Sequence, residues 1–295
     1  MTFLPAGATL TTGFFLIVAG SALFTRSLEA TVERFFENRN RGLRILGNIS
    51  LSLPELILPL IAFLTPGAGR SLIEAGTGAL FGPPLFLSLF LVPLAFFLGR
   101  AQARSLFREI PFLAAGLAAA LLLFGRSLPL RALLALALGA LYLWGLLSSP
   151  DHEDSTGAGD SPARWSMKDG LSVGGGALLM GLGSHLFLSG IAGLQEASGL
   201  SSFWTALLLG PIATEAPELL TLTHFLRKRS LTQSFVLLWG SIHLQVTLSI
   251  AAGLLISTWT GSSDALHAGL ALLGALTLLF GLALRKGGMT GKSTP

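Results

Sequence analysis

The sequence contains no cysteine and few charged residues. Asp, Glu, Lys and Arg together account for 12% of its 295 residues. The lack of cysteine excludes disulfide bonds, thiolate catalysis and metal sites with cysteine ligands. Hydrophobic residues make up 52% of the chain and the mean hydropathy is +0.72, more than the core of a soluble domain of this length needs. We therefore predict an integral membrane protein in a lipid bilayer.

Motifs of several other functional classes are missing as well. The sequence has no H-E-x-x-H or G-x-S-G motif, which argues against an intramembrane protease. The Gly174-Gly175-Gly176 run follows no predicted strand and no G-x-x-x-x-G-K-S pattern is present, so we interpret the run as a place of close helix packing. The basic and aromatic pattern of a nucleic-acid surface is also lacking. We expect no enzyme activity, no bound cofactor and no nucleic-acid partner.

The apolar runs predict an all-α fold, a polytopic bundle of transmembrane helices. A helix needs about 20 apolar residues to cross a bilayer. Because no Lys or Arg precedes the first run, it lacks the basic start of a cleaved signal peptide and is predicted to be a retained span. We predict nine spans: Thr9 to Leu28, Gly42 to Leu64, Ser71 to Leu98, Ile110 to Phe124, Leu128 to Leu147, Leu171 to Leu194, Phe203 to Phe225, Leu231 to Ile256, and Leu266 to Leu284.

Positive charges are distributed unevenly between the two sides of these spans. Clusters of Lys and Arg follow spans one, three, seven and nine. The loops on the other side carry only three arginines: Arg70, Arg126 and Arg131. Because cytoplasmic loops carry the excess of Lys and Arg, we predict an external N-terminus and a cytoplasmic C-terminus. We expect the plasma membrane, which is the inner membrane of a bacterium.

One hydrophilic stretch, residues 148–169, divides the chain. It contains Pro150-Asp151-His152-Glu153-Asp154 and a Gly/Ser-rich tract, a composition that does not fold alone, so we predict a flexible cytoplasmic linker. The composition also favours a solvated loop over a metal site at His152. The remaining regions are a first repeat at residues 1–147, a second repeat at residues 170–286 and a cytoplasmic tail at residues 287–295.

Two segments in opposite halves of the chain are versions of one another. Residues 50–56 read Ser-Leu-Ser-Leu-Pro-Glu-Leu, and residues 213–219 read Ala-Thr-Glu-Ala-Pro-Glu-Leu. Each places a glutamate, Glu55 or Glu218, inside a predicted span, where an ionised carboxylate costs about 3 kcal/mol or more. Two such carboxylates at matched positions are best explained by cation binding.

The halves also match outside these motifs. A Gly-Ser pair followed by Leu-Phe occurs in span one at Gly20-Ser21 and in span six at Gly183-Ser184. Because five spans precede the second unit, the two units must lie in opposite orientations across the membrane. The sequence therefore predicts an inverted repeat of five and four helices, with broken helices in spans 2/3 and 7/8. Such repeats commonly build secondary transporters.

A proline before each glutamate gives a reason for the broken helices. Pro54 and Pro217 have no backbone N–H, so the carbonyls of Ser50 and Ala213 lose their usual helical partners. Freed carbonyls beside a carboxylate are hard oxygen ligands suited to Na⁺ or Ca²⁺. We therefore include Ser50 and Ala213 among the candidate cation ligands.

With these motifs the sequence resembles the calcium/cation antiporter superfamily, which includes sodium/calcium and cation/proton exchangers. Both repeats of that family carry a motif close to G-T-S-L-P-E-L. Here the first repeat keeps residues 52–56, and the second keeps Thr214 and residues 217–219. The resemblance covers nearly the whole chain in architecture. It implies ten spans, so the last family helix has no counterpart among the nine predicted here.

The family motif continues in the next span of each repeat with G-S-N and a further polar residue. The second repeat keeps Gly240-Ser241, with Gln245 where the family usually has Asn or Asp. The first repeat has Gly76-Thr77, but Phe81 stands where that Asn or Asp would be. This departure weakens one half of the family site.

The resemblance implies an antiporter in which Glu55 and Glu218 are the central cation ligands. It implies further oxygen ligands from five side chains: Ser52, Thr214, Thr77, Ser241 and Gln245. It also implies exchange of Ca²⁺ or a related cation for Na⁺ or H⁺ by alternating access, through movement of spans one and six. For the two glutamates a structural ion pair is the other interpretation, and the repeat symmetry favours cation binding. The inorganic cations are the substrates of such an antiporter. The sequence leaves open whether the protein forms a homo-oligomer.

Glu215 departs from the family motif, which has Ser at this position. It lies three residues before Glu218 and therefore on the same helical face. Two ionised carboxylates this close repel each other, so the pair would favour a proton or a divalent ion over Na⁺. In the other interpretation Glu215 contacts a polar neighbour outside the site.

Further residues and two further functions stay open at the level of sequence. His243 lies between Ser241 and Gln245 and faces elsewhere on a helix, so we expect a packed histidine. Ordinary packing is also our interpretation of Trp239, while Glu74 either lines an access funnel or reaches outer water.

A degenerate family member with altered or lost ion specificity is one alternative function. A cation channel, which would pass one ion without obligatory exchange, is the other.

Overall fold

The computed structural model describes residues 3–35, 52–95, 100–123, 126–148, 167–215, 231–256 and 263–287, together with Leu219, Thr223 and Arg227. Most of the predicted linker and nearly all of the predicted tail, at residues 149–166 and 288–295, lie outside this part of the chain. Within the described ranges the chain forms helices and short connections, without a strand. The helices are α1 (Phe3–Phe35), α3 (Leu53–Leu64), α4 (Arg70–Ala95), α5 (Arg100–Leu122), α6 (Leu128–Ser148), α7 (Met167–Ser198), α8 (Ser202–Thr214), α10 (Leu231–Leu244), the π-helix η1 (Gln245–Ser249), α11 (Ile250–Ile256) and α12 (Ser263–Gly287).

Six stretches of helix among the described residues are long and apolar enough to cross a membrane. They confirm the prediction of an integral membrane protein built as a helical bundle. α5 is longer than its predicted span and begins at Arg100 instead of Ile110. The ten added residues are mostly good helix formers such as Ala, Arg, Gln and Glu, so the helix extends beyond its apolar part.

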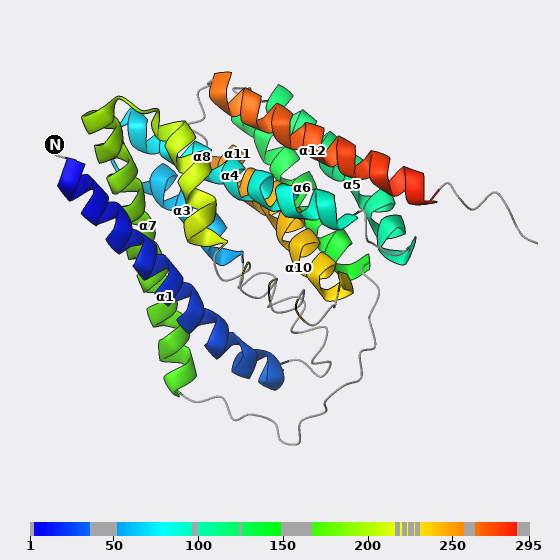
Figure 1. Ribbon diagram of the computed structural model, residues 1–295, viewed down its shortest axis with the longest axis horizontal. Coiled ribbons are helices and arrows are strands. Elements are labelled where there is room, and N and C mark those ends of the chain that lie inside the picture. Colours follow the sequence, from blue (N-terminus) through cyan, green and yellow to red (C-terminus); the bar gives the residue numbers. More distant parts are fainter. Residues whose placement is uncertain are drawn as a thin grey trace, which may run out of the picture.

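Helices from opposite halves of the chain pack together in pairs (Figure 1). α1 lies against α7, and α5 lies against α12, on either side of α4. α1 and α7 are in backbone contact: a Cβ on Gly13 would lie 2.6 Å from the carbonyl oxygen of Gly183, and one on Gly20 would lie 2.7 Å from that of Gly176. Glycines at these positions therefore let two apolar helices pack closely without a groove of side chains between them.

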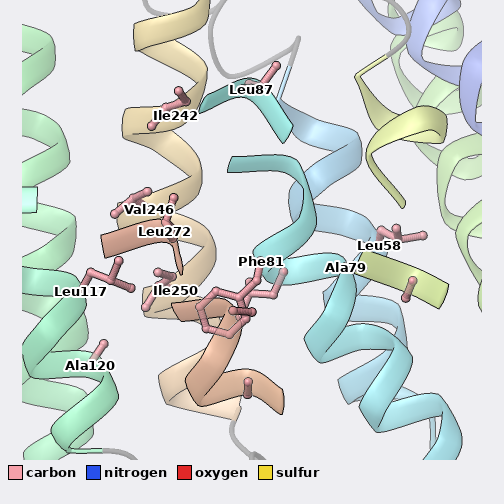
Figure 2. Packing of buried hydrophobic residues seen from close by; sticks show 14 of the residues in the cluster. Leu58, Ala79, Phe81, Leu87, Leu117, Ala120, Ile242, Val246, Ile250 and Leu272 are labelled. Atoms are coloured by element: carbon pink, nitrogen blue, oxygen red, sulfur yellow. The ribbon is translucent and has the colours of Figure 1, made fainter. Parts of the chain in front are cut away.

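The hydrophobic core lies around α4. Figure 2 shows Phe81 of this helix among buried side chains of neighbouring helices, with Leu117 of α5, Ile250 of α11 and Leu272 of α12 nearby. All four side chains are at most 1% exposed. Phe81, which stands where the resemblance places a polar residue, is thus part of the apolar core.

Three of the helices that carry the repeated motifs are interrupted at the motif residues: one begins there, one ends there and one changes from α-helical to π-helical geometry. α3 begins at Leu53 with Pro54 in its first turn, and α8 ends at Thr214. A π-helical segment starts at Gln245, between α10 and α11. α4, by contrast, is continuous from Arg70 to Ala95. Proline is tolerated in a first turn because the N–H it lacks has no partner there in any helix.

Candidate functional site

The first repeat contributes Ser52 and Glu55 from the beginning of α3. The Ser-x-x-Glu spacing is that of a helix-capping box, yet the Ser52 side chain makes no capping hydrogen bond to α3. It lies instead 2.9 Å from the hydroxyl oxygen of Ser241, which is 189 residues away in sequence. Glu55 follows in the first turn of α3 and is 2% exposed. The positive end of the helix dipole there stabilises a carboxylate.

The second repeat contributes Thr214 and Glu215 from the end of α8. Both side chains are fully buried. The Thr214 hydroxyl donates to the carbonyl oxygen of Gly210, one turn earlier, at 3.2 Å. Its oxygen keeps acceptor capacity for a cation or another donor. Glu215 is the residue that follows α8, and its carboxylate lies at the negative end of the helix dipole.

Ser241 and Gln245 join the two repeats through hydrogen bonds. The Gln245 amide nitrogen donates to Glu215 Oε1 at 2.8 Å and to Ser241 Oγ at 3.1 Å. Together with the contact between Ser52 and Ser241, these bonds form a continuous chain from α3 to the end of α8. Its four members are each at most 2% exposed. The structure therefore brings four of the candidate ligands into one buried polar cluster.

Two carboxylates in this region lie away from bulk water, Glu55 at 2% and Glu215 at 0% exposure. An ionised carboxylate in such surroundings is stable only with a cation or strong donors nearby. Gln245 supplies one donor, but an amide carries no charge to balance the carboxylate. The Gln245 amide nitrogen faces Glu215, so ligation of a cation by the amide oxygen, as predicted, requires a rotation that exchanges the two ends of the amide. The two buried carboxylates can therefore bind a positively charged ion.

The remaining candidate ligands are placed as follows. Thr77 on α4 is 5% exposed, and its hydroxyl donates to the Ile73 carbonyl oxygen at 2.8 Å. Ala213, whose carbonyl is a candidate ligand, has a fully buried side chain. Glu218 and Ser50 lie outside the described residues, as does Pro217. Their roles stay predictions.

A second buried polar cluster, which was not predicted, adjoins α10. Glu109 of α5 is 2% exposed and accepts a hydrogen bond from the Trp239 indole nitrogen at 2.6 Å. His243 of α10 is packed, as expected, with its ring 5.9 Å from that of Tyr142. Glu109 lies directly after Arg108 and one residue before the predicted span, and no role was predicted for it. No signal within the single sequence pairs it with Trp239.

Glu74 of α4 lies at the rim of the described bundle. Its carboxylate accepts from Arg70 Nε at 2.7 Å, and both residues line a cavity of about 440 Å³ with Gln195 and Ser201. Gln195 Oε1 in turn accepts from the Ser202 hydroxyl. This position beside a water-accessible cavity is compatible with both interpretations of Glu74, which were an access funnel and contact with outer water.

Comparisons with known proteins agree with this fold. Residues 6–148 match the family model described as sodium/calcium exchanger protein. The chain is similar to the crystal structure of the H⁺/Ca²⁺ exchanger CAX, with 19% identity, a TM-score of 0.61 and coverage of 96% of this chain and 74% of that one. It is also similar to the sodium-calcium exchanger NCX_Mj soaked with zero Na⁺ and Ca²⁺, with 17% identity, a TM-score of 0.52 and coverage of 97% and 92%. Among curated protein sequences, no match to this chain was found.

Proposed function

We propose that the chain is a member of the calcium/cation antiporter superfamily and a secondary active antiporter that exchanges Ca²⁺ or a related cation for Na⁺ or H⁺. The match of residues 6–148 to the sodium/calcium exchanger family model and the similarity in fold to CAX and NCX_Mj support this proposal. The observation that carries this proposal is the buried chain of hydrogen bonds from Ser52 through Ser241 and Gln245 to Glu215. It places hydroxyl, amide and carboxylate groups of both repeats in one water-poor region. Oxygen-rich sites of this kind suit Ca²⁺ and Na⁺.

Charge balance supplies the exchange mechanism. Glu55 and Glu215 are buried carboxylates, and Glu218 is a third candidate outside the described residues. A divalent cation, monovalent cations or protons can each neutralise such a group, and they compete for the same oxygens. If the protein changes access only when the charge is neutralised, inward movement of one ion requires outward movement of another. This is the coupling expected of an antiporter.

The extra carboxylate bears on ion preference. Glu215 is fully buried and hydrogen-bonded to Gln245, within the polar cluster and not outside it. A site with this added negative charge binds a divalent cation more strongly than a monovalent one, because the interaction energy scales with ion charge. We therefore propose that Ca²⁺ or a similar divalent ion is the preferred substrate, with protons as the competing ion when Glu215 is protonated.

The orientation and division of the chain are part of the same proposal. We propose an external N-terminus, a cytoplasmic C-terminus and a location in the inner membrane of a bacterium, from the distribution of Lys and Arg. The two repeats are assigned to residues 1–147 and 170–286, joined by a cytoplasmic linker at 148–169. The pairing of α1 with α7 and of α5 with α12 supports this division.

Ion flux into proteoliposomes tests the proposal. Vesicles containing a Ca²⁺ indicator are given an inward Ca²⁺ gradient, with Na⁺ or H⁺ gradients imposed separately in the opposite direction. We expect Ca²⁺ uptake that requires an ion on the other side and is abolished by Glu55→Gln. Glu196→Gln, which alters an exposed glutamate near the end of α7, serves as the matched control. Uptake driven by membrane potential alone would indicate a channel, and no uptake under any gradient would indicate a member that has lost transport.

A further inference from the structure

Glu109 forms the centre of the cluster that adjoins α10. Its carboxylate oxygen Oε2 accepts the Trp239 indole N–H at 2.6 Å, and His243 Nδ1 lies 3.9 Å from the same oxygen. The other oxygen, Oε1, lies 4.0 Å from the half-exposed guanidinium of Arg108. Trp239 and His243 are one helical turn apart, so both project from the same face of α10. A single buried carboxylate thus contacts two successive turns of one face.

The opposite wall of this cluster is formed by α6. The Tyr142 ring packs edge-on against the His243 ring, with centroids 5.9 Å apart. A Cβ at Gly145 would overlap the imidazole, since it would lie 2.7 Å from His243 Nδ1 and closer still to Cε1. The imidazole therefore fits only because residue 145 has no side chain. α5 and α6 together confine the face of α10 that carries Trp239 and His243.

The other face of the same helix carries the proposed cation ligands. Ser241 lies two residues from Trp239 and two from His243, and Gln245 lies two residues beyond His243. Residues two apart in an α-helix project about 200° from each other. One side of α10 is therefore held by Glu109. The other side presents Ser241 toward Ser52, and Gln245, the first residue of the adjoining η1, donates to Glu215.

We infer that Glu109 is a positioning residue for the cation site: through Trp239 and His243 it fixes the rotation of α10 about its own axis. A side-chain oxygen lies about 5–6 Å from a helix axis, so a rotation of about 10° moves it by about 1 Å. The range of Ca²⁺–oxygen distances is about 2.3–2.6 Å, which is narrower than this displacement. The hydrogen bond from Trp239 needs an acceptor at residue 109 and not a charge. This inference rests on the antiporter function proposed above.

The test compares variants that keep or remove this acceptor. Glu109→Gln keeps a carbonyl oxygen for the Trp239 N–H, whereas Glu109→Leu removes it, and Trp239→Phe removes the donor while keeping an aromatic ring. We expect Glu109→Leu and Trp239→Phe each to raise the KM for Ca²⁺ about tenfold, the loss expected when a buried donor or acceptor is left without its hydrogen-bond partner, with the maximal rate changed less than about twofold. Glu109→Gln should stay within about threefold of wild type. The double variant should be no worse than either single change, because both remove the same bond.

Several outcomes would overturn this inference. If Glu109→Gln is as impaired as Glu109→Leu, the carboxylate acts through its charge, as an ion or proton carrier would. If neither Glu109→Leu nor Trp239→Phe changes the KM, the contact has no influence on the site. If Glu109→Leu fails to fold, as judged by size-exclusion chromatography in detergent, the KM of Trp239→Phe tests the inference by itself.

The same measurements separate this inference from the proposed function. If wild type shows no Ca²⁺-dependent exchange and no Ca²⁺-dependent thermal stabilisation, the function itself is wrong. If wild type transports, Glu55→Gln does not, and the Glu109 and Trp239 variants keep the wild-type KM, only the positioning role is wrong. Ca²⁺-dependent thermal stabilisation of the purified variants gives an apparent affinity that does not depend on transport.

Discussion

Glu215→Gln is the substitution that changes the charge of the site while disturbing its shape least. Glutamine has nearly the size of glutamate, and its carbonyl oxygen can still accept the 2.8 Å hydrogen bond from Gln245. Glu215 is fully buried, so the substitution removes a desolvated charge. We therefore expect two effects of opposite sign, one on cation affinity and one on stability.

The magnitude follows from burial and ion charge. Replacing a charged partner by a neutral one weakens an interaction of this type by about 1.5–3 kcal/mol, which corresponds to about 10- to 100-fold in Ca²⁺ affinity. Because interaction energy is proportional to ion charge, the loss for Na⁺ should be about half in free energy, or about 3- to 10-fold. The ratio of Ca²⁺ to Na⁺ affinity therefore falls. In the absence of Ca²⁺, removing the buried charge should raise the thermal stability.

The assay combines flux with thermal unfolding. Ca²⁺ uptake into proteoliposomes is measured over a range of Ca²⁺, Na⁺ and pH, and unfolding of the purified protein is measured with and without Ca²⁺. Glu215→Asp, which keeps the charge on a shorter side chain, separates charge from geometry. Glu196→Gln is the control for an exposed carboxylate.

The reasoning would be refuted by an unchanged ion preference together with an unchanged pH dependence in Glu215→Gln. Equal losses of Ca²⁺ and Na⁺ affinity would also contradict it, because they would indicate a change of geometry and not of charge. A fall in stability without Ca²⁺ would show that the folded protein needs this carboxylate as a structural acceptor.

Three further predictions test other parts of the structure. Gly183→Ala places a Cβ 2.7 Å from the backbone of α1 and should destabilise the protein by about 1–3 kcal/mol in detergent unfolding, whereas Gly181→Ala, with open space around it, should change stability by less than about 0.5 kcal/mol. Ser52→Ala and Ser241→Ala should each weaken Ca²⁺ affinity, and their effects should be non-additive in a double-mutant cycle because their hydroxyls are in contact. Phe81→Asn should lower the melting temperature without increasing Ca²⁺ affinity, because it exchanges a fully buried ring for an amide within the apolar core.

The membrane-spanning architecture could be predicted from sequence because it depends on local composition. Apolar runs long enough to cross a bilayer are readable residue by residue, and the described helices overlap all nine predicted spans. The pairing of Ser52 with Ser241 was predictable only through the repeat, since it joins residues 189 positions apart. Which end of the Gln245 amide faces Glu215 was not predictable, because it depends on the donors and acceptors that surround it in space.

Glu109 shows where a single sequence stops being informative. Its neighbours on the chain are arginines and apolar residues, a pattern typical of a helix end at the membrane surface. The structure extends α5 by ten residues and buries Glu109 under Trp239, which is 130 positions away. A buried ionisable group with a distant partner leaves no local periodicity. Only the tertiary arrangement distinguishes it from an interfacial glutamate.

The π-helical segment explains how one helix can serve both the core and the site. Ile242, Val246, Ile250 and Leu254 recur every four residues and are each at most 1% exposed. Figure 2 shows the first three along one side of the helix. In a regular α-helix a four-residue repeat drifts by about 40° at each step, or about 120° over three steps. The wider turns of η1, which begins at Gln245, reduce this drift and keep the apolar stripe against the core. Because the stripe is kept in place by this local change of helix geometry, the Gln245 amide stays directed at the buried carboxylate of Glu215 and at the Ser241 hydroxyl.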